Sequence, residues 1–141
     1  MRLHGKGMAK IIKRESLVPD MRYGPKNLRA AYGIDRHTVG SQKMTMQYSV
    51  IPAGARNQRH YHVACDAGMY ILQGRLRLLF GPSHEPQEAV AEVGDFVFIP
   101  QGEIHGLENL SAVEPAELIA CYGGAGSKEE AQVIFMEPSW D

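Results

Sequence analysis

Apolar and polar residues alternate along much of the chain, which is typical of β-strands with two different faces. Residues 43–51 show this most clearly. One face would carry Met44, Met46, Tyr48 and Val50, and the other Thr45, Gln47 and Ser49. Similar alternation or short apolar runs predict further strands at residues 69–72, 75–80, 90–93, 96–99, 107–109, 116–122 and 132–136.

The segments between these runs are rich in glycine and proline, which favour turns. Residues 18–35 contain Pro19, Pro25 and Gly33, and we expect them to be mostly loop. Residues 10–13 are expected to form a short edge strand, and residues 128–131 a single helical turn. Many short strands separated by turns indicate an all-β sandwich or barrel, and periodicity leaves the choice between these two open.

The length and net charge of the chain limit the classes of protein to which it can belong. A chain of 141 residues predicts one domain, which we expect at residues 18–141 behind an N-terminal arm at residues 1–17. The net charge of -1 predicts no general attraction to nucleic acid or to an anionic membrane, and no apolar run is long enough to span a bilayer. Two cysteines, Cys65 and Cys121, fit a reducing compartment, so we expect a cytoplasmic protein.

Three of the six histidines form the candidate chemistry. His60 and His62 are two residues apart, so on a strand they point to the same face, about 6.6 Å apart. His105 follows a strand and a Pro/Gly turn. Together these imidazoles predict a site for one metal ion. The isolated His4, His37 and His84 are expected to lie outside it.

The spacing around these histidines resembles two motifs of the cupin superfamily. The first covers residues 54–74 and matches at Gly54, His60, His62 and Gly74. The second covers residues 94–109 and matches at Gly94, Pro100, Gly102, His105 and Asn109. The resemblance implies a small single-domain cupin: an all-β double-stranded β-helix, or jelly-roll barrel, with the metal in its mouth. Asn109 has a structural place in this motif.

The chain departs from the first motif where metal-binding cupins have a glutamate. Counting back from Gly74 puts Ala67 at that position. Asp66 is the nearest replacement ligand, but its side chain is short and strand parity turns it away. Cys65 is expected to be a buried small hydrophobe rather than a ligand. Three imidazoles suit iron, nickel, copper or zinc and leave open positions for substrate.

Three functions remain open. The resemblance favours a three-histidine Fe(II) dioxygenase acting on a small anionic, chelating substrate, with manganese, nickel or zinc as other possible ions. The alternatives are a metal-dependent lyase or isomerase of sugar-acid or keto-acid type, and a non-enzymatic small-molecule-binding protein. No residue is assigned a catalytic role.

The remaining aromatic and polar candidates are expected to have ordinary roles. Core packing is expected for Tyr48, Tyr70, Phe96, Phe98 and Tyr122. Solvated positions at the rim of the barrel are expected for Gln47, Gln58, Arg59 and Arg75. Small cupins, which this chain resembles, pair their barrels. We therefore expect a homodimer with the arm at residues 1–17 docked on the partner.

Overall fold

The computed structural model describes residues 8–20 and 28–136, and its strands form two five-stranded antiparallel sheets. In spatial order, the first sheet contains β1 (Arg29–Ile34), β2 (Met44–Ile51), β9 (Ala116–Gly123), β4 (Asp66–Gln73) and β7 (Phe96–Ile99). The second contains β10 (Val133–Phe135), β3 (His60–His62), β8 (His105–Asn109), β5 (Arg75–Phe80) and β6 (Gln87–Glu92). The expected all-β jelly-roll fold is confirmed.

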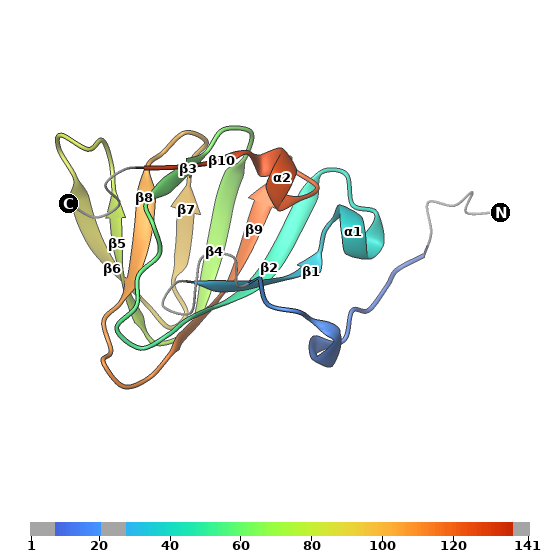
Figure 1. Ribbon diagram of the computed structural model, residues 1–141, viewed down its shortest axis with the longest axis horizontal. Coiled ribbons are helices and arrows are strands. Elements are labelled where there is room, and N and C mark those ends of the chain that lie inside the picture. The colour runs from blue at the N-terminus through green and yellow to red at the C-terminus, as the bar shows by residue number, and fades with distance from the viewer. Residues whose placement is uncertain (1–7, 21–27, 137–141) are drawn as a thin grey trace.

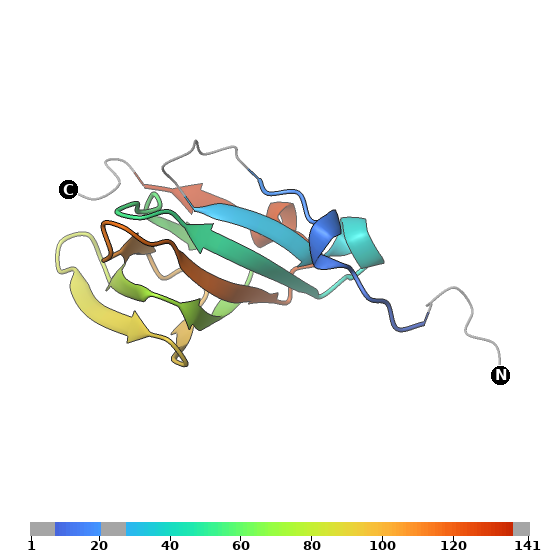
Figure 2. The ribbon, with the colours of Figure 1, turned by 90° about the horizontal axis from the view of Figure 1, so that it is seen from below.

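Short helical segments complete the described part of the chain. They are the 3-10 turn η1 (Arg14–Ser16) and the helices α1 (Arg36–Val39) and α2 (Lys128–Ala131). Both α1 and the pair β1–β2 lie at the end of the molecule opposite β5 and β6 (Figures 1 and 2). Helix α2 immediately precedes β10, which pairs with β3, so residues near the C-terminus reach the histidine strand.

The apolar core lies between the sheets and follows the pleat of the strands. In β4, for example, Ala67, Met69 and Ile71 are buried, and the residues between them are more exposed. The sharp connection from β4 to β5 passes through Gly74, whose φ is +90° and whose added Cβ would lie 2.9 Å from Cβ of Ala116. The closing glycine of the first motif is therefore required by both backbone conformation and space.

Most strand predictions are confirmed, and two elements differ. Residues 10–13 form no strand and lead into η1. The segment at residues 18–35, expected to be mostly loop, contains β1, which pairs with β2 along most of its length. The register of that pair shifts between Tyr32 and Ile34, on either side of Gly33. A bulge interrupts alternation, and this explains why the pattern did not reveal the strand.

Strand parity on β2 places its polar face inward. Thr45, Gln47 and Ser49 are buried, whereas Met44 is exposed and Tyr48 is only partly buried. Core packing was also the wrong prediction for three aromatic residues of β4 and β7. Phe96 is 82% exposed, Phe98 66% and Tyr70 37%. Of the five aromatic residues considered, Tyr122 is the one that is buried.

Candidate metal centre

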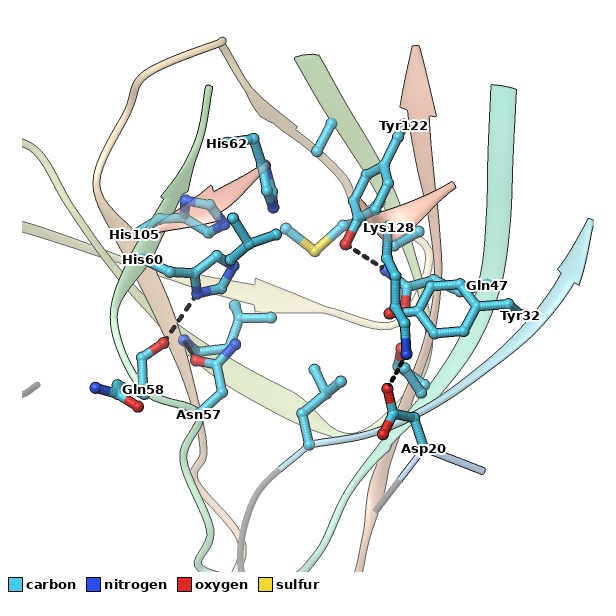
Figure 3. A pocket seen from close by; sticks show the side chains of 18 of the residues that line it. Asp20, Tyr32, Gln47, Asn57, Gln58, His60, His62, His105, Tyr122 and Lys128 are labelled. Carbon is cyan, nitrogen blue, oxygen red and sulfur yellow. Dashed lines mark hydrogen bonds and ion pairs between the residues drawn. The ribbon is translucent and has the colours of Figure 1, made fainter. Parts of the chain in front are cut away.

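The fold brings His60, His62 and His105 together on two neighbouring strands. His60 of β3 and His105 of β8 are direct cross-strand partners, with ring centroids 4.3 Å apart. The His62 ring lies 5.1 Å from each of the other two rings. One nitrogen from each imidazole lies within 4.8 Å of the others, so the three side chains can hold one metal ion. Figure 3 shows the rings converging on one side of a cavity.

Backbone carbonyl groups orient two of the three rings. Nδ1 of His60 lies 2.9 Å from the carbonyl oxygen of Gln58, and Nδ1 of His105 lies 2.9 Å from that of Glu103. A carbonyl oxygen can only accept, so in each ring Nδ1 is the donor and Nε2 keeps its lone pair. His62 is buried, and both its ring nitrogens lack a hydrogen-bond partner among the described residues. A metal ion would satisfy such an orphaned nitrogen.

Burial keeps these imidazoles neutral. It lowers the pKa of His62 to about 4, with His60 as the second cause. Burial also lowers the pKa of His60, against the opposing effect of the Gln58 carbonyl. The pKa of His105 lies well below its ordinary value, mainly through burial and then through His60. Neutral imidazole is the form that binds metal, so the site needs no deprotonation at neutral pH.

No carboxylate joins the three histidines among the residues that the structure describes. Ala67 of β4 is buried and lines the same cavity, opposite Tyr122 in the sheet. The neighbouring Asp66 points outward, where its Oδ1 accepts a hydrogen bond from the backbone N–H of Gln101 at 2.9 Å. Cys65 is buried in the apolar core, and burial, with Asp66 second, raises the pKa of its thiol to about 11. The structure therefore places neither replacement ligand at the histidines.

The other histidines lie elsewhere or cannot be placed. His37 is exposed and its Nε2 lies 3.2 Å from a carboxylate oxygen of Glu129, while His84 is exposed in the turn before β6. His4 lies outside the described residues.

The histidines line a cavity of about 390 Å³ between the sheets. Apolar side chains from β4, β8 and β9 form much of its wall, including Met69, Leu107 and Leu118. Figure 3 shows Gln47, Tyr32, Lys128 and Asp20 on the side opposite the histidines. Lys128 forms an ion pair with Asp20 and lies 5.1 Å from the centroid of the Tyr32 ring. The cationic group in this wall is therefore already neutralised by a carboxylate.

Of the four residues expected at the solvated rim of the barrel, some are buried or line the cavity and one is exposed. Gln47 is 7% exposed and lines the cavity, so its expected solvated position was wrong. Arg59 is also buried, and Gln58 lines the cavity near His60. Arg75 is exposed and pairs with Glu92, as expected for a solvated side chain.

Sequence reasoning assigned no site role to Ser49, Tyr122 or Lys128, all of which line the cavity. The Tyr122 ring lies 5.0 Å from the His62 ring, and its hydroxyl accepts a hydrogen bond from Nε2 of Gln47 at 3.2 Å. The available signal was the polar face of residues 43–51. A polar stripe on a central strand indicates a lined cavity when it turns inward.

Comparison with known proteins agrees with this geometry. Residues 47–122 match the family described as the cupin domain. An uncharacterized protein, MJ1618 from Methanocaldococcus jannaschii, is 27% identical over 93 residues, covering 65% of this chain and 70% of that protein.

Two solved structures show the same fold. An oxalate oxidase superposes with a TM-score of 0.68 at 16% identity, covering 81% of this chain and 57% of that one. The chain therefore spans little more than half of that enzyme. The polyketide cyclase RemF from Streptomyces resistomycificus superposes with a TM-score of 0.71 at 19% identity, covering 95% of this chain and 89% of RemF.

Within the described ranges, none of the helices has the length and apolar character needed to cross a bilayer.

Proposed function

The chain belongs to the cupin family, and from this premise we propose that it is a metal-dependent enzyme acting on a small, anionic, oxygen-chelating substrate. His60 and His105 would hold one divalent transition ion through their Nε2 atoms, and His62 through one of its ring nitrogens. The supporting observation is the convergence of three neutral imidazoles, two of them buried and one partly buried, with two Nδ1 atoms tied to backbone carbonyls. This donor set suits iron, nickel, copper and zinc.

The side chain of Ala67 is central to the choice of substrate. It lines the cavity beside the histidines, at the position where the motif of metal-binding cupins has a glutamate. Three neutral ligands leave the full charge of a divalent ion uncompensated, so the site favours a substrate that brings its own negative charge. They also leave positions for two substrate oxygens. Enolates, hydroxybenzoates and catecholates have both properties.

When bound, the ion would supply Lewis acidity toward the substrate oxygens, and iron(II) would add redox chemistry with O2. The protein's own contribution is positioning and exclusion of water. The carbonyl groups of Gln58 and Glu103 fix the imidazoles, while the side chains of Met69, Leu107 and Leu118 surround an apolar substrate body. On this basis we favour an Fe(II)-dependent dioxygenase.

A non-redox lyase, isomerase or cyclase is the second candidate. It is supported by the similarity in size and fold to RemF, a polyketide cyclase, nearly all of which this chain covers. An enzyme of this class would use the ion to polarise a carbonyl group, and the same three histidines would serve it.

Oxygen uptake separates these proposals. Protein reconstituted anaerobically with iron(II) is mixed with β-diketones and hydroxybenzoates, and O2 consumption and product formation are measured together. Uptake matched to substrate loss supports the dioxygenase. Conversion without O2 uptake supports the second candidate. Binding of a substrate without its conversion, in the presence or absence of O2, would contradict both enzyme proposals and indicate a binding protein.

A further inference from the structure

The three inward-facing polar residues of β2 have unequal hydrogen bonding. Oγ1 of Thr45 donates to the backbone carbonyl oxygen of Ala125 at 2.8 Å, so this hydroxyl has a structural partner. The hydroxyl of Ser49 is 0% exposed and has no hydrogen-bond partner among the described residues. The side-chain oxygen of Gln47 is likewise buried without a partner in that part of the chain. A buried polar group without a partner destabilises the folded protein, so this arrangement needs an explanation.

Both unpartnered groups belong to the wall of the cavity. Gln47 and Ser49 line it, and Thr45 does not. Nε2 of Gln47 donates to the hydroxyl of Tyr122, and the amide oxygen is the atom without a partner. Figure 3 shows Gln47 across the cavity from the three histidines. The cavity thus has the three histidines at one end and, on β2, two neutral polar groups at the other.

We infer that Gln47 and Ser49 form a second binding subsite, which recognises a hydroxyl or N–H group at the end of the substrate remote from the metal. An amide oxygen only accepts hydrogen bonds, so the substrate must present a donor to Gln47. A second carboxylate is disfavoured, because Gln47 repels it and the nearby Lys128 is already paired with Asp20. The inference rests on the proposed function in that the substrate binds at the histidines.

The class of substrate follows from the groups at the two ends of the cavity. One end is an anionic chelator, the middle is apolar and contacts Met69 and Leu118, and the far end is a neutral hydroxyl or amine. A hydroxylated aromatic acid or a polyhydroxylated aromatic ketone fits this description. A small dicarboxylate such as oxalate does not, because it has no apolar body and no remote donor.

The test uses ligand binding to the zinc-loaded protein, so that no oxidative turnover occurs. The probes are salicylate, the dihydroxybenzoates that add one hydroxyl at each free ring position, the matching methoxysalicylates, and the equivalent hydroxynaphthoates. Affinity is measured by calorimetry after metal content has been verified. We expect at least one hydroxylated probe to bind about three- to tenfold more tightly than both its parent and its methoxy analogue. The methoxy group keeps the acceptor and removes the donor.

Two variants and a matched control locate the effect. Ser49→Ala and Gln47→Met should each remove much of the hydroxyl preference, whereas Thr45→Val, on the same face of the same strand, should keep it. Thermal unfolding of the metal-free protein provides a second readout. Ser49→Ala should leave the unfolding temperature unchanged or raise it, because it removes an unpartnered hydroxyl. Thr45→Val should lower it, because the Ala125 carbonyl loses its donor.

The inference is overturned if no hydroxylated probe binds more tightly than its parent, if the methoxy analogues bind as well, or if the preference survives in both variants. Those results would mean that the substrate does not reach the two groups and that they serve packing alone. The wild-type probe series needs no variant, so a variant that fails to fold does not remove the test. Absence of O2 uptake would count against the dioxygenase and leave this comparison of affinities intact.

Discussion

His60 and His105 face each other across the pairing of β3 with β8, and their ring centroids are 4.3 Å apart. Two imidazoles this close have their Nε2 atoms directed to one place, because each Nδ1 is tied to a backbone carbonyl. We expect about one divalent transition ion per chain, and His105→Ala should weaken binding about 100-fold or more. Metal titration with elemental analysis checks this, with the exposed His84→Ala as a control that keeps full affinity. Wild-type protein that stays empty after addition of iron, manganese, nickel or zinc would refute the site.

The lowered histidine pKa values predict how stability depends on pH. Without metal, the folded protein keeps these imidazoles neutral while the unfolded chain protonates them below about pH 6.5. The unfolded state then binds more protons, so the free energy of unfolding should be fully present above about pH 6.5 and fall as pH decreases. For His62 this loss should continue to about pH 4, where the folded state also binds its proton.

Each histidine contributes a slope of at most about 1.4 kcal/mol per pH unit. Urea unfolding of metal-free protein between pH 5 and 7 measures the total slope, in a range where most carboxylates stay ionised. His105→Ala should make the slope shallower than in the wild type. Equal slopes in the wild type and His105→Ala would contradict the neutral, buried state of His105.

Asn109 of the second motif is predicted to act through the fold alone. Its buried amide nitrogen lies 2.8 Å from the carbonyl oxygen of Glu114 and 3.1 Å from that of Ile51, and its side-chain oxygen accepts from the N–H of Ser111 at 2.9 Å. Asn109→Ala should lower the free energy of unfolding by about 2–4 kcal/mol, because several buried backbone groups lose their partner. Metal affinity of the folded fraction should not change. Ser111→Ala, in the same loop, is the matched milder change, because the half-buried hydroxyl accepts from the exposed N–H groups of Val113 and Glu114.

The homodimer remains a prediction, and the structure suggests which surface to test. The outer face of the first sheet exposes Phe96 and Phe98, and the Phe96 ring lies 4.8 Å from that of Tyr70 on the neighbouring strand. Exposed aromatic residues side by side on a sheet are typical of a face that binds another protein surface. We expect light scattering at micromolar concentration to show a dimer, and Phe96→Glu with Phe98→Glu to dissociate it.

Two further changes make the assembly test specific. Val113→Glu alters an equally exposed apolar residue in the loop between β8 and β9 and should leave the dimer intact. Deletion of residues 1–17 tests the arm. Of this arm the structure describes residues 8–17, and there the guanidinium carbon of Arg14 lies 5.6 Å from the centroid of the Tyr48 ring of the same chain. A dimer that survives the deletion would mean that the arm is not the contact.

Local pattern predicted the strands that alternate without interruption. The boundaries of β5 and β7 were predicted to the residue, and β2 nearly so, because their periodicity is regular. Strand β1 was missed because the bulge at Gly33 breaks its alternation, although its partner β2 is the next strand along the chain.

The sequence also does not reveal which of the two faces of a strand points inward, and this limited what could be predicted about the site. The His60–His62 spacing indicated a shared face, and the two motifs added His105, so the histidine cluster could be inferred from the sequence. The inward-facing side of β2 could not be inferred from the sequence, because the apolar face of this strand covers the outside and its polar face lines the cavity. Gln47 therefore looked like a solvated residue until its neighbours across the sheet were known.

Ala67→Glu tests the mechanism, since Ala67 lines the cavity opposite Tyr122, whose ring contacts that of His62. A carboxylate here would lower the charge of a loaded site from about +2 to about +1, so divalent metal should bind more tightly. It would also compete with a chelating substrate for the same position, and salicylate should bind more weakly to the metal-loaded variant. Without metal, the buried carboxylate should destabilise the protein by several kcal/mol, and added metal should restore stability. Ala120→Glu is the matched control, because Ala120 lines the cavity beside Gln47 and its destabilisation should resist added metal. If metal fails to rescue Ala67→Glu as well, Ala67 lies outside the reach of the ion, and the missing glutamate no longer supports a substrate that supplies its own charge.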